Sequence, residues 1–374
     1  MLKKFTVKNF KNFKDELLFD LSNTKKFEFN ELCVKNGIVN NALIYGPNAS
    51  GKSNLAFAMF DIISNITDKQ KKAEFYSTYL NAENTNALAE FKYDFVFDNN
   101  CLEYTYGKKS YEEIVYERIY INGDLLIEYD RRGKNSSNAL INLLGAETLN
   151  KDISQMKISI VKYIKNNAVL GDTVETRTFN SFLSFVDRML HFRSLDDRFY
   201  QGYDVGVRDI FEEMILSNNT KAFMDFLKKA EIYCNLEIVS INNKKRLVFK
   251  FGDNTIDFWE NASTGTHSLS LFYYWLQKIK ADTNRPSLLF IDEFDAFYHQ
   301  TVSETLVREL IGNNFQTILT THNTSLMTND LLRPDCYYIL KNNQINPFSA
   351  LTDKDIRKAH NIEKMYKAGS FNNE

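Results

Sequence analysis

The segment that most constrains the fold is 46–53, with the sequence Gly-Pro-Asn-Ala-Ser-Gly-Lys-Ser. An apolar run at 42–45 precedes it, and a segment rich in apolar residues, 54–60, follows it. This order predicts a strand, a glycine-rich loop and a helix. Glycines allow backbone conformations that a Cβ atom would block, so the N–H groups of the loop can surround a phosphate at the positive end of the helix. The sequence therefore predicts a phosphate-binding loop.

The residue types of this loop suit ATP with Mg²⁺. Lys52 supplies a mobile cation for the β- and γ-phosphates, and Ser53 supplies a hydroxyl for the metal ion. A plain strand–turn–helix connection is the alternative, but the flanking segments provide the context that a phosphate loop requires. The predicted ATP-binding residues of this segment are Gly46, Pro47, Asn48, Ala49, Ser50, Gly51, Lys52, Ser53 and Asn54.

A second apolar run, 287–291, ends in the carboxylates Asp292 and Glu293. At the end of a buried strand, Asp292 would order the shell of a Mg²⁺ ion that Ser53 also contacts. Glu293 would orient or deprotonate the attacking water, which is the division of labour that nucleotide hydrolysis needs. A solvated strand end is the alternative. We therefore predict an ATPase with Ser53 and Asp292 at the metal and Glu293 as a catalytic residue.

Three further features accompany these motifs. Ser263, Gly265 and Thr266 open a predicted helix, where a hydroxyl and a glycine amide can bind an anion, although a serine there is often a simple cap. His322 ends the predicted strand 317–323 and is a candidate for contact with a γ-phosphate or the attacking water; a structural histidine is the alternative. Asp295 is a candidate for a dimer-interface loop, with a solvated turn as its alternative.

Length and composition limit the remaining choices. The chain has 374 residues, enough for two or three core units, and a net charge of −2, so no whole-chain field attracts nucleic acid or membrane. Any DNA contact must come from a local patch. Four scattered cysteines indicate a reducing compartment and form no metal cluster. Without a secretory signal or an apolar run of membrane-spanning length, we expect a soluble cytoplasmic protein.

Hydrophobic periodicity divides the chain into β-rich and helical parts. Alternation at 5–21 and 91–129 predicts antiparallel strands; we prefer a half-buried sheet to an RNA-stacking platform because basic residues do not line one face. The pattern turns helical from 152 to about 233. Strands at 236–239 and 247–251 follow, and then helices and strands alternate, which implies a parallel sheet with crossovers. The predicted elements of this last part are helices at 267–280 and 301–311 and strands at 287–291, 317–323 and, as the last strand, 336–340.

These motifs, in this order, resemble those of the ABC-type ATPase heads of the SMC/RecF/OLD group. Within it the chain looks most like the AAA-class, stand-alone RloA-like and abortive-infection ATPases of bacterial defence loci. The motifs match those of this group strongly towards both ends of the chain. From about residue 73 to 254, only the order of helices and strands matches. The segments that carry it are 5–14 (Phe-Thr-Val-Lys-Asn-Phe-Lys-Asn-Phe-Lys), 45–55, 331–335 and 361–366.

The resemblance implies an α/β fold, a P-loop NTPase of the ABC-type head class with two lobes and a helical insertion. It also implies that Lys11 and Asn12 lie at the ATP. Each ATP would be held by 46–53 of one chain and by the Ser263–Thr266 signature of a second copy, in a homodimer or higher homo-oligomer. The implied division is lobe I at 1–150, the insertion at 151–232, lobe II at 233–350 and a tail at 351–374.

The function implied by the resemblance is an ATP-driven switch or sensor in antiphage defence that controls a separately encoded effector such as a Toprim-type nuclease. A RecF-like ATPase that binds DNA in repair and a scaffold with little turnover are the alternatives. The chain departs from the family pattern in its Ser-Thr-Gly-Thr signature and in lacking a clear Q-loop glutamine, because Gln70 lies too close to the loop helix. Asp353 and Asp355 have Toprim-like spacing without room for that fold, so we expect a solvated turn.

Overall fold

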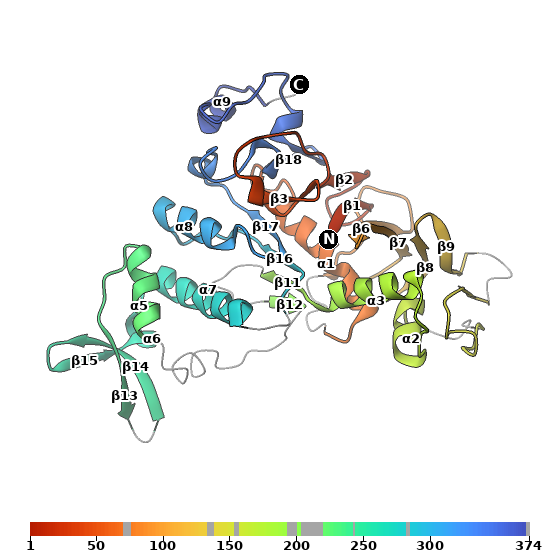
Figure 1. Cartoon of the computed structure of the whole chain (residues 1–374), viewed down its shortest axis with the longest axis horizontal. Helices are drawn as coiled ribbons and strands as arrows, with labels where there is room; N and C mark the ends of the chain where they lie inside the picture. Colours follow the sequence, from red (N-terminus) through yellow and green to blue (C-terminus); the bar gives the residue numbers. More distant parts are fainter. Residues whose placement is uncertain are drawn as a thin grey trace.

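The computed structural model describes residues 1–69, 76–132, 138–152, 157–192, 200–202, 220–241, 244–281 and 285–371. Helix α1 (Lys52–Ile66), which follows the phosphate loop, lies between two seven-stranded sheets (Figure 1). The Tyr93 hydroxyl of one sheet donates to the Ala58 carbonyl of α1 at 3.0 Å, and Phe60 of α1 contacts Phe290 of the other sheet. The helix therefore forms the shared core of both sheets.

The first sheet is antiparallel and has the order β10-β9-β8-β7-β6-β1-β2. Its meander confirms the predicted strands of 91–129, and Asn122 and Gly123 form the turn between β8 and β9 with φ angles of 52° and 94°. The strand bounds are β1 (Leu2–Lys8), β2 (Leu17–Asp20), β6 (Ala89–Phe97), β7 (Asn100–Lys108), β8 (Ile114–Ile121), β9 (Asp124–Asp130) and β10 (Leu140–Ile141).

The second sheet has the order β12-β11-β16-β17-β5-β18-β19, and the five strands from β11 to β18 run parallel. Their carboxyl ends share one edge, so the phosphate loop after β5 and the residues after β16 and β17 meet there. The strand bounds are β5 (Asn41–Tyr45), β11 (Met189–Phe192), β12 (Tyr200–Gly202), β16 (Leu288–Ile291), β17 (Gln316–Thr320), β18 (Tyr337–Lys341) and β19 (Gln344–Pro347).

Helices cover the two sheets, and a small three-stranded sheet, β13-β14-β15, projects from the body beside α5 and α6 (Figure 1). No helix in the described ranges has the length and apolar character needed to cross a membrane. The remaining helices are α2 (Ile160–Asn167), α3 (Val174–Asp187), α5 (Thr220–Lys229), α6 (Phe258–Asn261), α7 (Thr264–Ala281), α8 (Gln300–Leu310) and α9 (Ile362–Lys367). The small strands are β3 (Val34–Lys35), β4 (Ile38–Val39), β13 (Leu236–Ile241), β14 (Lys244–Phe251) and β15 (Asn254–Asp257). Short 3₁₀ turns occupy Glu31–Cys33, Thr324–Leu326, Pro334–Cys336 and Phe348–Ala350.

Two expectations about elements are wrong. Met189 was expected on a helical face, but it begins β11, which pairs in parallel with β16 inside the central sheet. The strand at 336–340 is not the last, because β19 pairs back on it. Helices α2 and α3 do occur within the predicted helical stretch. The division into lobes at residues 150 and 232 stays a prediction.

A buried ion pair joins α1 to the antiparallel sheet. The Lys108 ammonium of β7 lies 3.1 Å from Asp61 Oδ2 of α1, and both side chains are almost fully buried. The Tyr106 hydroxyl donates to the same carboxylate at 2.9 Å, and Lys108 donates further to Asn65 Oδ1 at 3.2 Å. Burial lowers the pKa of Lys108, while the Asp61 charge opposes that shift. The pair therefore keeps the two charges compensated in a site that water does not reach.

A second buried carboxylate, Glu117 of β8, anchors α2. Its Oε1 accepts hydrogen bonds from the hydroxyls of Tyr104 and Ser159, both at 2.6 Å, and its Oε2 accepts one from the Ile160 N–H at 2.7 Å. Burial raises the pKa of Glu117 in spite of these donors. The first turn of α2 is thus tied to the sheet that also holds α1.

We predict that Lys108→Met lowers the free energy of unfolding by about 3–5 kcal/mol, because it leaves Asp61 buried without its cation. The measurement is urea denaturation of the full chain. Lys109→Met is the matched control. Lys109 forms an ion pair with Glu113, and both side chains are 52% exposed. Exposed pairs of this kind contribute about 1 kcal/mol or less to the free energy of unfolding. Equal losses for the two variants would contradict the structural role of the buried pair. In the double variant Asp61→Asn/Lys108→Met, we expect a loss smaller than the sum of the single losses.

Candidate nucleotide-binding site

The phosphate loop turns sharply between β5 and α1. Ala49 and Gly51 have positive φ angles of 62° and 101°. A Cβ atom on Gly46 would lie 2.5 Å from the Leu340 carbonyl oxygen, and one on Gly51 would lie 2.4 Å from Asn12 Nδ2. Close packing therefore requires glycine at both positions, and at Gly51 the backbone conformation favours it as well.

Lys52 lies at the start of α1 and turns its ammonium back into the loop. Its Nζ donates to the carbonyl oxygens of Gly46 at 3.0 Å and Pro47 at 3.2 Å, and the residue is only 5% exposed. Burial lowers the pKa of Lys52, and the charges of Asp292 and Glu293 partly oppose this shift. The cation is thus held where the loop would surround a phosphate.

Asp292 meets Ser53, as expected for two residues that share one metal ion. It directly follows β16, is 2% exposed, and lies close enough to the Ser53 hydroxyl for that group to act on its pKa. Burial raises its pKa, and the hydroxyls of Ser53 and Thr320 act in the opposite direction. Hydroxyl and carboxylate oxygens are ligands that Mg²⁺ accepts, usually completed by phosphates and water. Among the described residues, no group of three or more histidine, cysteine or acidic side chains is placed so that it could hold a metal ion by itself. This pair therefore fits Mg²⁺ bound with a nucleotide.

Thr320, the last residue of β17, bonds to both Asp292 and Glu293. Its hydroxyl donates to Asp292 Oδ1 at 2.6 Å and accepts the Glu293 N–H at 2.7 Å. Glu293 has a positive φ of 50°, and its side chain is exposed beside the buried Asp292. Sequence reasoning gave Thr320 no role; the only available signal was its position at the end of the strand that neighbours β16.

The residues that follow Thr320 lie at the same carboxyl edge of the sheet, and Thr321 bonds to Asp295 there. The Thr321 hydroxyl donates to Asp295 Oδ2 at 2.8 Å and accepts the Asn323 N–H at 2.9 Å. Burial raises the pKa of Asp295. Partial burial and the nearby Lys52 charge lower the pKa of His322, whereas Glu293 and Asp295 act against that shift. His322 is therefore electrostatically coupled to both the phosphate loop and Glu293.

Of the two N-terminal candidates, Asn12 contacts the phosphate loop. Its Nδ2 donates to the Ser50 carbonyl oxygen at 3.5 Å, and its Oδ1 accepts from Asn54 Nδ2 at 2.6 Å. The Lys11 ammonium lies 3.4 Å from the Thr78 carbonyl oxygen and 5.5 Å from the centre of the Phe57 ring. Burial lowers the pKa of Lys11. Gln70, considered above for a Q-loop, lies outside the described residues.

The signature residues cap helix α7. Ser263 Oγ accepts the Thr266 N–H at 3.2 Å and lies 2.9 Å from the Thr266 hydroxyl. A Cβ on Gly265 would lie 2.9 Å from the Phe297 carbonyl oxygen, so this turn packs on the loop that follows Asp295. In the described parts of the chain, no hydrogen bond or ion pair joins 263–266 to 46–53. Ser263 itself is exposed. Asp353 and Asp355 are exposed too, as expected of a solvated turn.

Several solved structures are similar to this chain over nearly its whole length. The SMC head domain from Thermotoga maritima is 16% identical, with 92% of this chain and 98% of that chain covered and a TM-score of 0.43. An SMC head bound to the C-winged helix domain of ScpA is 13% identical, with coverages of 92% and 97% and a TM-score of 0.46. The recombination mediator RecF with ATP is 15% identical, with coverages of 93% and 99% and a TM-score of 0.39. At such values the likeness says nothing about function.

The family comparison is more informative. A search of the curated proteins gave no match. Residues 42–328, well over half of the chain, match the family described as "AAA domain, putative AbiEii toxin, Type IV TA system". This span begins in β5 and contains the phosphate loop, Asp292, Glu293 and His322. The α/β P-loop fold, with its ATPase motifs at one sheet edge, agrees with that match, and the chain belongs to this family of AAA domains.

Proposed function

We propose that the protein is an ATPase that dimerises head to tail around ATP and acts as a switch. The observation that carries the proposal is the position of Asp292, which accepts a hydrogen bond from the Thr320 hydroxyl and lies beside Ser53 and the buried Lys52. Three segments far apart in the sequence supply these groups. Their convergence at the carboxyl edge of a parallel sheet supports nucleotide chemistry over a purely structural role.

In the proposed hydrolysis, Lys52 binds the β- and γ-phosphates, and Ser53 and Asp292 hold Mg²⁺. Held by these two residues, Mg²⁺ would supply positive charge against the charge that develops on the transferred phosphoryl group. Glu293 orients and deprotonates the attacking water, and its exposed side chain is open to that water. Thr320 is a positioning residue, because one hydroxyl fixes both the metal carboxylate and the backbone of the base. His322 contacts the γ-phosphate or the attacking water from the neighbouring strand end.

The second half of the proposed site comes from another copy of the chain. Ser263 is exposed and its hydroxyl bonds to Thr266 within its own helix turn, so this turn is accessible to the ATP that a partner holds. A two-fold dimer would place each signature turn over the partner's phosphate loop and form two equal sites. ATP would drive closure because it binds the closed dimer better than the single chain. Asp295, near the Gly265–Phe297 contact, belongs to the proposed interface.

We further infer a role for this switch in antiphage defence, where the closed dimer controls a separate effector such as a Toprim-type nuclease. The family description, which names an AbiEii toxin and a type IV toxin–antitoxin system, supports a controlled role of this kind.

We predict that Glu293→Gln reduces steady-state ATP turnover by at least about 100-fold, because it replaces the basic carboxylate by a neutral amide of nearly the same size. ATP binding should persist, and the ATP-bound dimer should accumulate in size-exclusion chromatography with light scattering. Unchanged turnover would remove Glu293 from the mechanism.

A Thr320 series tests the positioning role. Thr320→Val deletes both hydrogen bonds without a large change in volume, and we expect turnover to fall about 10–100-fold, with a smaller change in ATP affinity. Thr320→Ser keeps the hydroxyl and should retain most of the activity. If the valine and serine variants lose turnover equally, packing rather than the hydroxyl is what matters at this position.

Mixing two inactive variants tests the head-to-tail dimer. Lys52→Ala should abolish ATP binding and ATP-dependent dimerisation, and Ser263→Arg should bind ATP but fail to close. In a mixed dimer, one site carries both defects and the other carries none. An equimolar mixture should therefore regain up to about half of wild-type turnover, since only mixed dimers can close and each has one intact site of two. Activity no higher than that of the separate variants, or dimerisation of Lys52→Ala with ATP, would contradict the shared site.

A further inference from the structure

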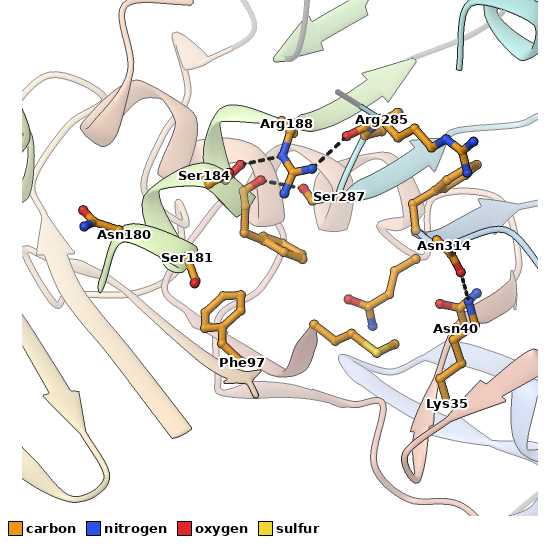
Figure 2. Close-up of a pocket in the computed structure, with 15 residues that line it drawn as sticks. Lys35, Asn40, Phe97, Asn180, Ser181, Ser184, Arg188, Arg285, Ser287 and Asn314 are labelled. Atoms are coloured by element: carbon orange, nitrogen blue, oxygen red, sulfur yellow. Dashed lines mark hydrogen bonds between the residues drawn. The ribbon is translucent and has the colours of Figure 1, made fainter. Parts of the chain in front are cut away.

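A cavity of about 900 Å³ lies at the edge of the parallel sheet opposite to the phosphate loop (Figure 2). Asn40, Ser287 and Gln316 line it, and these residues stand at or just before the amino ends of β5, β16 and β17. The carboxyl ends of the same strands carry the phosphate loop, Asp292 and Thr320. A five-residue strand spans about 16 Å, so a small molecule in this cavity would not touch the phosphate loop.

The charged groups around the cavity are all basic. Lys35, Arg188 and Arg285 line it, and no carboxylate does so among the described residues. This excess contrasts with the net charge of −2 of the whole chain. At 900 Å³ the cavity lies within the range of small-molecule sites. The local field therefore favours an anionic ligand.

The hydrogen bonds of these cations leave their charges uncompensated. Lys35 Nζ donates to the Asn313 carbonyl oxygen at 2.6 Å and to Asn314 Oδ1 at 3.2 Å. Arg188 donates to the carbonyl oxygens of Ser184 at 3.1 Å and Arg285 at 3.3 Å. All of these acceptors are neutral, and no ion pair forms between the three cations and a carboxylate in the described ranges. Partial burial also lowers the pKa of Lys35, so an anion nearby would favour its charged form.

An aromatic ring and polar side chains complete the walls. Phe97, at the end of β6, is partly buried and lies 6.0 Å from the Phe185 ring. Figure 2 shows it across the space from Arg188, with Ser181 of α3 beside it. A planar base can stack on such a ring, hydroxyl and amide groups can bond a sugar, and a guanidinium is well suited to a phosphate. These three kinds of group, on one cavity, match the three parts of a nucleotide.

We propose that this cavity binds a nucleoside monophosphate, with its base against Phe97 and its phosphate between Arg188 and Arg285. The site is distinct from the ATP site and does not depend on the function proposed above. The cavity lies between the two large sheets: β6 and α3 form one wall, and the strand ends of the parallel sheet form another.

The test titrates AMP into the Lys52→Ala chain by calorimetry, so that the phosphate loop does not contribute. We expect one site whose affinity falls as salt rises. Arg188→Glu/Arg285→Glu should weaken it by about tenfold or more, because two charge-assisted bonds become repulsions. Arg177→Glu is the matched control: Arg177 lies on α3, which Arg188 directly follows, is 60% exposed, and pairs with Asp172 outside the cavity. Phe97→Ala should weaken AMP but leave inorganic phosphate unchanged.

Three results would overturn the proposal. One is the absence of AMP binding to the Lys52→Ala chain. Another is an equal loss of affinity for the cavity variants and for Arg177→Glu. The third is binding of a single-stranded oligonucleotide without binding of AMP, which would make the basic wall part of a nucleic-acid surface. Arg188→Lys, which keeps the charge, should retain more affinity than Arg188→Glu and so separates a charge effect from misfolding.

Discussion

The burial of α1 on almost every side is the constraint on which the rest of the structure depends. Twelve of its fifteen residues are buried, among them Asp61 and Asn65. A helix so enclosed cannot turn these polar groups to water, so the antiparallel sheet must supply their partners. Lys108 and Tyr106 do so from β7. Because rotation of α1 would leave a buried charge uncompensated, this pair fixes the orientation of the helix and of the phosphate loop that begins it.

At the other end of the site, two adjacent hydroxyls determine where the acidic groups lie. Thr320 fixes Asp292 and the backbone of Glu293, and Thr321 fixes Asp295. A left-handed conformation at a non-glycine residue such as Glu293 costs on the order of 1–3 kcal/mol and persists only where its surroundings hold it. The Thr320 hydroxyl, which accepts the Glu293 N–H, is such a restraint. The strand ends thus maintain a strained turn that exposes the proposed base next to a buried metal ligand.

The sequence alone predicted the features that depend on residues close to one another in the chain. The loop glycines, Lys52 and the buried run before Asp292 each carry their own pattern, and the alternation in 91–129 predicted the meander correctly. It did not predict features that depend on the pairing of strands far apart in the sequence. Met189–Phe192 follows α3 without a turn signal and becomes a strand only because β16, about a hundred residues later, lies beside it. The role of Thr320 also requires knowing which strand neighbours β16, which spacing along the chain does not reveal.

Lys108 with Asp61, and Lys52 with Asp292, are two sets of buried lysine and aspartate side chains that differ in whether the charges touch. Lys108 and Asp61 contact each other directly at 3.1 Å, so each neutralises the other. Lys52 instead donates to loop carbonyls and Asp292 accepts from hydroxyls, and neither forms an ion pair in the described residues. Burial shifts the pKa of Lys52 and of Asp292 towards the neutral form, as it also does for Lys108. A phosphate beside Lys52 and a divalent cation beside Asp292 would reverse both shifts. Keeping these charges apart weakens the free protein locally but leaves both of them available to a metal-bound nucleotide, which a direct pair would not.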